Sequence, residues 1–299
     1  MLLNIGGHGL GDCFLALQIS YLLKERNIPH VNCISTREQV FNPLKHITNG
    51  VFELNHISED ISSDNKIVLN QELQNQLKTK FNCSEITYNV PDLLFKHPLA
   101  LNYDKYLLNP QLIKKQRVLV SSVKEKENII YCGLATSTNG YLYTFLKELL
   151  IELAEALPSY TIYFPNIKKW DREVNMGSFN NLPRNVVIDE DPKFENSLDI
   201  LKKSKYGIFS CNGPSHVAYH LGIPRLILDP QFNKLPWITR WKEDYEECVP
   251  LSLDFKLIKE IVCANINTPQ TLLFDRKILA NLLMNNHNNW SNLLYFKFD

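Results

Sequence analysis

Short apolar runs alternate with helix-length apolar patterns from the start of the chain. Residues 2–5 form an apolar run of the length of a buried strand. After a glycine-rich turn, Phe14 and Tyr21 mark one apolar face at helical spacing, which predicts an amphipathic helix over 12–26. The next apolar run covers 30–34. A strand, a helix and a second strand in this order predict a parallel α/β sheet.

The same alternation returns more clearly in the second half of the chain. It predicts strands at 128–132, 160–164, 185–188, 206–210 and 225–228, and helices at 141–157, 195–203, 215–221 and from 255 onward. Between the halves the pattern is weaker, with an apolar piece at 51–54, a polar helix at 71–80 and a charged stretch at 124–128 that we interpret as a linker. We therefore predict two doubly wound α/β domains, 1–126 and 127–299.

Composition and charge narrow the class of protein. The 299 residues include 32 Lys+Arg and 32 Asp+Glu, and this balance argues against a general nucleic-acid binder, which needs a basic surface. The seven cysteines form no C-x-x-C pair, which favours reduced thiols in a reducing compartment. No apolar run approaches the about 20 residues of a membrane span, and the N-terminus lacks the basic region of a signal peptide. We expect a soluble, cytoplasmic protein.

The opening turn, IGGHGLGD, is the first candidate for chemistry. Its glycines match neither G-x-G-x-x-G nor a P-loop, but Gly9 and Gly11 leave room for a ligand above the following helix. Asp12 has two interpretations, an N-cap of that helix or a general base at the floor of a cleft. Capping hydrogen bonds would lower the pKa of its carboxyl and weaken it as a base. His8 is the rival base, or an ordinary polar surface residue.

The second candidate is the stretch CNGPSHVAYHLGIPRLILD. Asn212, Gly213 and Pro214 predict a tight turn into a short helix, with Ser215 and His216 in its first turn. Free backbone N–H groups at such a helix start can bind an anion, and a nucleotide diphosphate fits at the carboxyl end of a parallel sheet. The alternative is an ordinary capped helix in which His216 donates to a backbone carbonyl.

Both stretches resemble motifs of one family. GLGDCFLALQISYLL is similar to the opening of the bacterial heptosyltransferases, and CNGPSHVAYHLGIPRLIL is similar to their second motif, D-[ST]-G-P-x-H. The resemblance implies a GT-B fold, in which two Rossmann-like domains bind the acceptor and the nucleotide-sugar donor. It implies that Asp12 activates the acceptor hydroxyl. It also implies that His216 and the Gly213–Pro214 backbone hold the donor diphosphate, generally without a metal.

The chain departs from the family pattern at two places. The acidic first residue of the second motif, before S/T-G-P, is replaced by Cys211, and the lysine of the family's K-x-W-P stretch is absent from the corresponding segment, 137–143. We therefore expect a sugar other than heptose. Lys168, after the strand at 160–164, is a candidate replacement cation, and Glu190 is a candidate contact to the ribose or nucleobase. The alternative interpretation of each residue is a solvated surface charge.

These observations favour an inverting, metal-independent glycosyltransferase with a nucleotide-sugar donor. Its acceptor would be a saccharide hydroxyl of a glycan or a glycolipid, the latter compatible with contact to a membrane surface. Two alternatives remain open at this point. One is a sugar-nucleotide epimerase on the same scaffold. The other is a non-catalytic, nucleotide-binding relative, which the missing lysine and acidic residue would explain.

Overall fold

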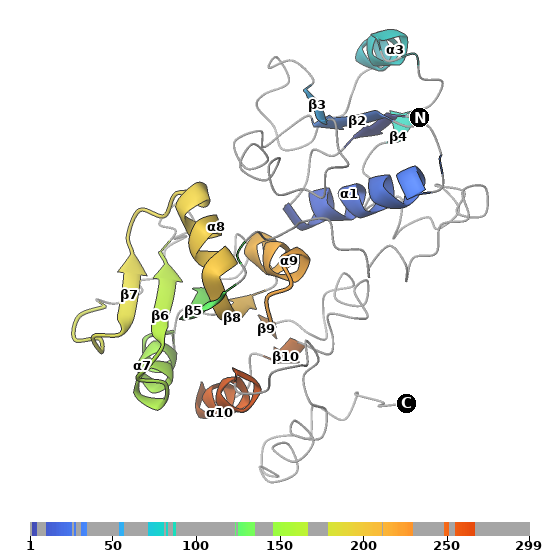
Figure 1. Cartoon of the computed structure of the whole chain (residues 1–299). Coiled ribbons are helices and arrows are strands. Elements are labelled where there is room, and N and C mark those ends of the chain that lie inside the picture. The colour runs from blue at the N-terminus through green and yellow to red at the C-terminus, as the bar shows by residue number, and fades with distance from the viewer. Residues whose placement is uncertain are drawn as a thin grey trace. The chain divides into compact units, whose positions relative to one another are not determined.

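The fold is described from a computed structural model of the chain (Figure 1). The structure describes residues 2–4, 10–25, 27, 31–34, 54–56, 71–80, 82, 86–87, 123, 125–134, 146–166, 179–210, 212–229, 248–250 and 255–266. The chain divides into two compact units: unit 1 comprises Met1–Glu125, Lys193–Lys202 and Asn212–Gly222, and unit 2 comprises Lys126–Pro192, Lys203–Cys211 and Ile223–Asp299. The first boundary lies one residue before the predicted one. Unit 1 also takes two later segments that the pattern assigned to the second domain.

Unit 1 contains a parallel sheet with the order β3-β2-β1-β4. Its strands are β1 (Leu2–Asn4), β2 (Val31–Ile34), β3 (Leu54–His56) and β4 (Ile86–Thr87). Its described helices are α1 (Leu10–Glu25), α3 (Gln71–Lys80), α8 (Phe194–Lys203, whose last residue belongs to unit 2) and α9 (Gly213–His220). The β1-α1-β2 succession confirms the predicted parallel α/β start. The helix begins two residues earlier than predicted, and β3 covers only the end of the predicted apolar piece.

Unit 2 contains a second parallel sheet, with the order β10-β9-β8-β5-β6-β7 among the described strands (Figure 1). The strands are β5 (Glu127–Gly133), β6 (Thr161–Pro165), β7 (Val186–Asp189), β8 (Ser204–Ser210), β9 (Arg225–Asp229) and β10 (Cys248–Pro250). The chain first runs outward from β5 to one side and then returns to build the other side. The strand order therefore reverses between β5 and β8, and ligands of doubly wound sheets bind at the carboxyl ends beside such a point. The predicted linker was too long, because its last two residues belong to β5.

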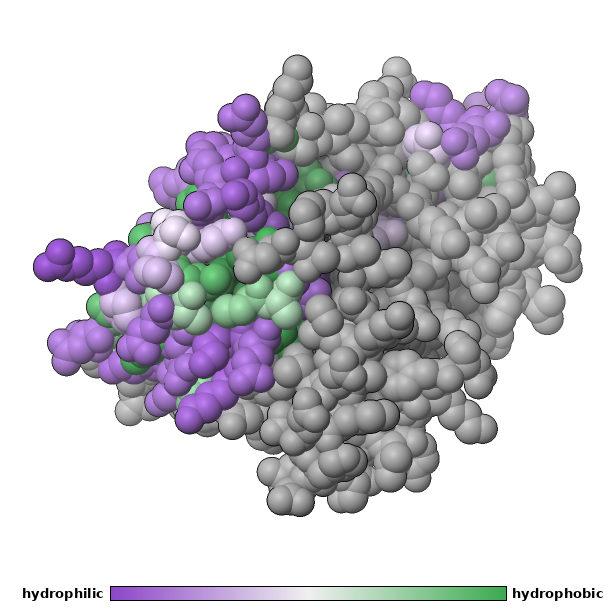
Figure 2. Space-filling view, turned by 60° about the horizontal axis from the view of Figure 1, so that its bottom comes forward, coloured by the Kyte–Doolittle hydropathy of each residue, from purple (hydrophilic) through white to green (hydrophobic). Residues whose placement is uncertain are grey.

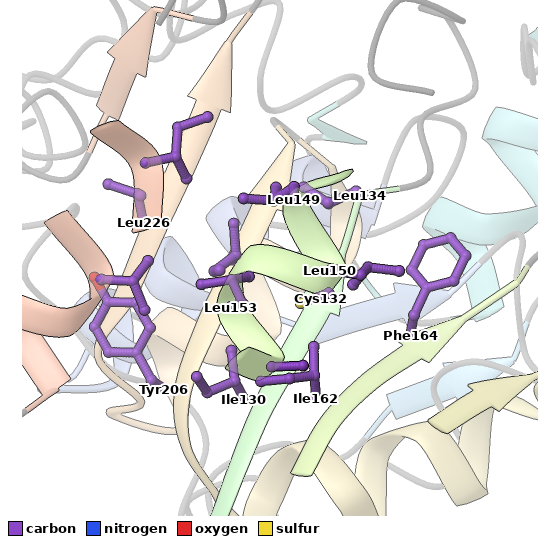
Figure 3. Close-up of a cluster of buried hydrophobic side chains, with 14 of the residues drawn as sticks. Ile130, Cys132, Leu134, Leu149, Leu150, Leu153, Ile162, Phe164, Tyr206 and Leu226 are labelled. Carbon is purple, nitrogen blue, oxygen red and sulfur yellow. The ribbon is translucent and has the colours of Figure 1, made fainter. Parts of the chain in front are cut away.

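One face of this sheet carries the core of unit 2 (Figure 3). Helices α7 (Leu146–Ala156) and α10 (Phe255–Ile266) contact each other and supply apolar side chains to it. Leu149 and Leu153 of α7 are fully buried, as are Ile130 of β5 and Ile162 of β6 (Figure 3). The helical spacing in the sequence predicted this face of α7, although the described helix begins at Leu146. Its predicted first residues lie outside the described part of the chain.

The opposite face of the sheet carries aromatic side chains. Tyr131 lies 5.5 Å from Tyr163 and 5.8 Å from Phe209, measured between ring centroids. The Phe209 ring covers the backbone of two glycines, because a Cβ on Gly207 would lie 2.2 Å from its Cε2 and one on Gly133 would lie 2.6 Å from its Cδ1. These two glycines therefore provide the space that the ring occupies.

The described surface is mainly hydrophilic on the face shown in Figure 2, with smaller apolar areas between the polar side chains. Among the described residues Val187, on the edge strand β7, is the large hydrophobic residue that stands out as exposed. None of the helices that the structure describes combines the length and the apolar character needed to cross a lipid bilayer.

Candidate functional site

The N-G-P-S stretch folds into a capped helix start. Asn212 is the N-cap of α9, with extended backbone angles of φ −142° and ψ 174°. Its Oδ1 accepts a hydrogen bond from the Ser215 N–H at 3.1 Å, and the Ser215 hydroxyl donates to the Asn212 carbonyl oxygen at 2.6 Å. Asparagine is among the best N-cap residues, and proline is tolerated in the first helical turn because its missing N–H would have no helical partner there.

This cap determines how much of the helix start a ligand can use. Pro214 has no amide N–H, and the N–H and hydroxyl of the buried Ser215 are both directed to Asn212. Of the first three residues of α9, only Gly213 then has a backbone N–H to offer to an anion. Fewer backbone donors are therefore available to an anion than the sequence pattern predicted, although the positive end of the helix dipole remains. Cys211, directly before the cap, lies outside the described residues.

The two histidines of α9 lie one helical turn apart and differ in burial. His216 is half-buried, whereas His220 is 2% exposed. The His220 ring lies 4.5 Å from the ring of Phe14 in α1, with an interplanar angle of 31°, and 5.2 Å from the Tyr219 ring in an edge-on arrangement. Both helices belong to unit 1. The helix that carries the second motif thus packs against the helix that carries the first.

The candidate residues of the opening turn lie at the start of α1. Gly11 and Asp12 are the second and third residues of the helix, so Asp12 is not the residue that precedes it. A carboxylate in the first turn still benefits from the helix dipole. At 1.5 Å rise per residue, Asp12 lies about 3 Å along α1 from Phe14, and His216 about 6 Å along α9 from His220. His8 and Gly9 lie outside the described residues, as does the side chain of Asp12.

A second group of polar side chains lies where β6 and β7 end, at the carboxyl edge of the unit 2 sheet. Asn166 follows β6 and Glu190 follows β7. The Asn166 Nδ2 donates to Glu190 Oε2 at 2.9 Å, and the Asn166 backbone N–H donates to the Asp189 carbonyl oxygen at 2.8 Å. Asn166 is only 5% exposed, whereas Glu190 is exposed. The expected cation Lys168 lies outside the described residues.

Two further hydrogen bonds stabilise this corner of the sheet, where β6 and β7 end. The Tyr163 hydroxyl donates to Asp189 Oδ2, and the Asp191 N–H donates to Asp189 Oδ1 at 3.3 Å. The Asp189 carboxylate, at the end of β7, thus accepts hydrogen bonds from both Tyr163 and Asp191. These two bonds hold its side chain in place at the edge of the sheet. Within the described part of the chain, no group of three or more His, Cys, Asp or Glu residues is arranged to hold a metal ion.

Asn166 is the residue of this corner that the sequence interpretation missed. A signal was present, because a polar residue directly after a buried strand lies at the edge where parallel sheets bind ligands. The sequence does not show, however, that β6 and β7 are hydrogen-bonded neighbours with Pro165 opposite Asp189. That register is what brings Asn166 to Glu190.

Comparisons with known proteins identify the fold. No family model matches the sequence, and no curated protein does. The structure of the E. coli ADP-heptose LPS heptosyltransferase II is similar, with a TM-score of 0.55, 13% identity, and 95% of this chain and 99% of that chain covered. A family 9 glycosyl transferase from Veillonella parvula has a TM-score of 0.52, 10% identity and coverage of 95% and 97%.

An enzyme of another class is similar to the same extent. The putative UDP-N-acetylglucosamine 2-epimerase from Listeria monocytogenes has a TM-score of 0.53, 10% identity, and coverage of 95% of this chain and 96% of that chain. At such low identities the likeness concerns the fold. The resemblance to heptosyltransferases is thus confirmed for the fold, and the chain has the GT-B fold of these glycosyltransferases.

Proposed function

We propose that this protein is an inverting, metal-independent glycosyltransferase that uses a nucleotide-sugar donor. The observation that carries the proposal is the contact between α1 and α9 through Phe14 and His220. It joins the helix with Asp12 in its first turn to the helix with Gly213 and His216 in its first turn. Similar structures support the reaction class, since one is an ADP-heptose heptosyltransferase and another a family 9 glycosyl transferase.

The chemistry divides between the two helix starts. The Asp12 carboxylate takes the proton of the acceptor hydroxyl as its oxygen attacks the anomeric carbon from the side opposite the donor diphosphate. The bond from that carbon to the diphosphate oxygen breaks, so the configuration inverts and the nucleoside diphosphate leaves. The positive end of the α9 dipole, the Gly213 N–H and the His216 side chain stabilise the charge on the leaving diphosphate. This is the charge that a metal would otherwise neutralise.

The acceptor in this proposal is a saccharide hydroxyl of a glycan or a glycolipid. The transferred sugar differs from heptose, because Cys211 replaces the acidic residue of the family motif and the K-x-W-P lysine is absent. The thiols of Cys132 and Cys263, which form no disulfide within the described part of the chain, fit a reducing compartment such as the cytoplasm.

The test separates binding from turnover. A thermal-shift screen against UDP, GDP, ADP and CDP identifies the nucleotide, since a ligand at a hundredfold excess over its dissociation constant stabilises the folded protein by about 2.7 kcal/mol.

With the corresponding donor, Asp12→Asn lowers turnover by about 10²- to 10⁴-fold, the usual contribution of a general base. Nucleotide affinity stays unchanged. The matched control is Glu25→Gln, the same type of change at the exposed end of α1. Wild-type turnover in Asp12→Asn would remove Asp12 from this role.

The epimerase alternative has its own support in the similar Listeria monocytogenes structure. Incubation of nucleotide-sugars without an acceptor distinguishes the two functions. An epimerase converts one nucleotide-sugar into another, whereas a transferase at most hydrolyses the donor slowly. Nucleotide binding with neither transfer nor epimerisation would favour the non-catalytic alternative.

A further inference from the structure

One buried polar atom at the edge of the unit 2 sheet has no hydrogen-bond partner among the described residues. Asn166 is 5% exposed, and its Oδ1 accepts no hydrogen bond from any group in the described part of the chain. Buried polar atoms are nearly always paired, because an unpaired one loses its hydration without compensation. Such an atom at a strand end therefore calls for an explanation, and a bound ligand is one.

The orientation of the amide follows from its neighbours. Nδ2 donates to the Glu190 carboxylate at 2.9 Å, so the reverse orientation would bring Oδ1 against a negatively charged oxygen. The backbone N–H of the same residue is held by the Asp189 carbonyl oxygen, and Asp189 is held in turn by Tyr163. Glu190 thus positions the amide, and the free atom is an acceptor. The missing partner must be an O–H or N–H donor.

The location of this acceptor matches that of a nucleoside site. β6 is the second strand of unit 2 in chain order and pairs directly with β5, from which the chain builds outward (Figure 1). In dinucleotide-binding sheets wound in this order, an acidic residue about 20 residues beyond the first turn accepts a hydrogen bond from the ribose. Here the residue after the second strand is an asparagine, whose amide oxygen accepts but carries no charge.

We propose that Asn166 Oδ1 accepts a hydrogen bond from the nucleoside part of the ligand and thereby determines nucleotide specificity. This inference rests on the proposed function, because it assumes that the protein binds a nucleotide. The donor is either a ribose hydroxyl or an amino group of the base, and both present the same chemistry to the amide oxygen. Glu190 is a positioning residue that acts through Asn166.

The experiment measures dissociation constants by calorimetry. The nucleoside diphosphate that binds wild type best is compared with its 2′-deoxy and 3′-deoxy analogues and with the analogue whose base amino group is replaced by a keto group, such as IDP for ADP. We expect one of these changes to weaken binding to wild type by about tenfold, the effect of one hydrogen bond to a buried acceptor. The analogue that does so identifies the donor as ribose or base.

The variants test whether Asn166 is the acceptor. In Asn166→Ala the ratio of the analogue's dissociation constant to that of the parent nucleotide falls to about one. The site then lacks the acceptor that distinguishes the two ligands. Asn196→Ala, an asparagine change at an exposed position of α8, retains the wild-type ratio. Glu190→Gln, a conservative change at an exposed position, places an amide that can both donate and accept beside Asn166, so the fixed orientation of the Asn166 amide is lost and the ratio falls as well. This second variant keeps the test valid if Asn166→Ala does not fold.

The outcomes separate this inference from the proposed function. If wild type binds a nucleotide but Asn166→Ala and Glu190→Gln keep the wild-type ratio, Asn166 is not the acceptor, while the proposed transferase stands. If wild type binds none of the nucleotides, both proposals fail.

Discussion

Phe14 and His220 lie ring to ring, with centroids 4.5 Å apart, and connect the helices that follow the two motifs of the sequence. Phe14 is fully buried and His220 is 2% exposed. Both rings therefore contribute packing as well as their mutual contact. The contact supports the proposal that Asp12 and His216 act in one site, because each belongs to one of the two packed helices.

The first prediction concerns this contact. Phe14→Ala lowers the free energy of unfolding by about 3–5 kcal/mol, as expected for a large aromatic side chain removed from a core. A double-mutant cycle with His220→Ala gives a coupling of about 0.5–1.5 kcal/mol, measured by urea denaturation. Tyr219→Phe, which keeps the edge-on ring beside His220, leaves the coupling unchanged. Strictly additive effects of Phe14→Ala and His220→Ala would contradict the contact.

The second prediction concerns the N-cap of α9. Asn212→Ala lowers the free energy of unfolding by about 1 kcal/mol, because the Ser215 N–H loses its acceptor. Asn212→Asp and Asn212→Ser both keep a capping oxygen and most of the stability. The aspartate also adds a negative charge beside Gly213, so it weakens binding of a nucleoside diphosphate relative to Asn212→Ser. Equal nucleotide affinity in these two variants, by calorimetry, would argue against a diphosphate at this helix start.

The third prediction concerns the glycines under Phe209. Gly207→Ala lowers the free energy of unfolding by about 1–3 kcal/mol, because the added Cβ would lie 2.2 Å from a ring that is fully buried. The measurement is urea denaturation, with the same substitution repeated in a Phe209→Leu background. There the smaller side chain reduces the clash, and Gly207→Ala costs less than in wild type. An equal cost in both backgrounds would show that the ring is not the obstacle.

The fourth prediction concerns pH. Burial raises the pKa of the Cys132 thiol from 9.0 to about 12, so the folded state holds this proton more tightly than the unfolded state. The resulting contribution to stability is fully present below about pH 9 and is lost as the pH rises from about 9 towards 12. Cys132→Val lacks the titrating group, so its free energy of unfolding falls less steeply over this range, by at most about 1.4 kcal/mol per pH unit.

Urea denaturation of wild type and Cys132→Val at several pH values checks this difference. Alkylation with iodoacetamide at pH 8 provides a second measurement, in which Cys132 reacts in the unfolded chain and is protected in the folded one. Parallel pH profiles for the two proteins, or rapid labelling of Cys132 in the folded protein, would contradict a buried, protonated thiol.

Local pattern was sufficient for much of the secondary structure. The polar helix α3 covers its predicted range, and β1, β2 and the strands from β5 to β9 agree with prediction to within one or two residues at most ends. Strands and helices of this kind follow from apolar periodicity, which depends on near neighbours in the chain. The short strands β4 and β10 were missed, because two or three residues carry no period. They are strands only through pairing with β1 and β9.

The helix starts show where local pattern stops being sufficient. The glycines before α1 obscured its first residue, so the helix was predicted to begin at Asp12, and one of the two interpretations of Asp12 was an N-cap; in the structure Asp12 is the third residue of the helix. At α9 the N-G-P-S stretch predicted the helix, but it did not predict which acceptors bind the N–H donors of its first turn. The Asn212 side chain could have faced a ligand or the helix, and in the structure it accepts from Ser215.

The sequence by itself determined the parallel α/β elements, the two motifs and their resemblance to a family, because each depends on residues that are close in the chain. Only the tertiary structure decided which distant residues meet. His220 reaches Phe14 because α9 packs on α1, and Asn166 reaches Glu190 because β6 and β7 are paired with their ends aligned. Packing and strand register are set by burial of the whole apolar surface, a property that no short stretch of sequence contains.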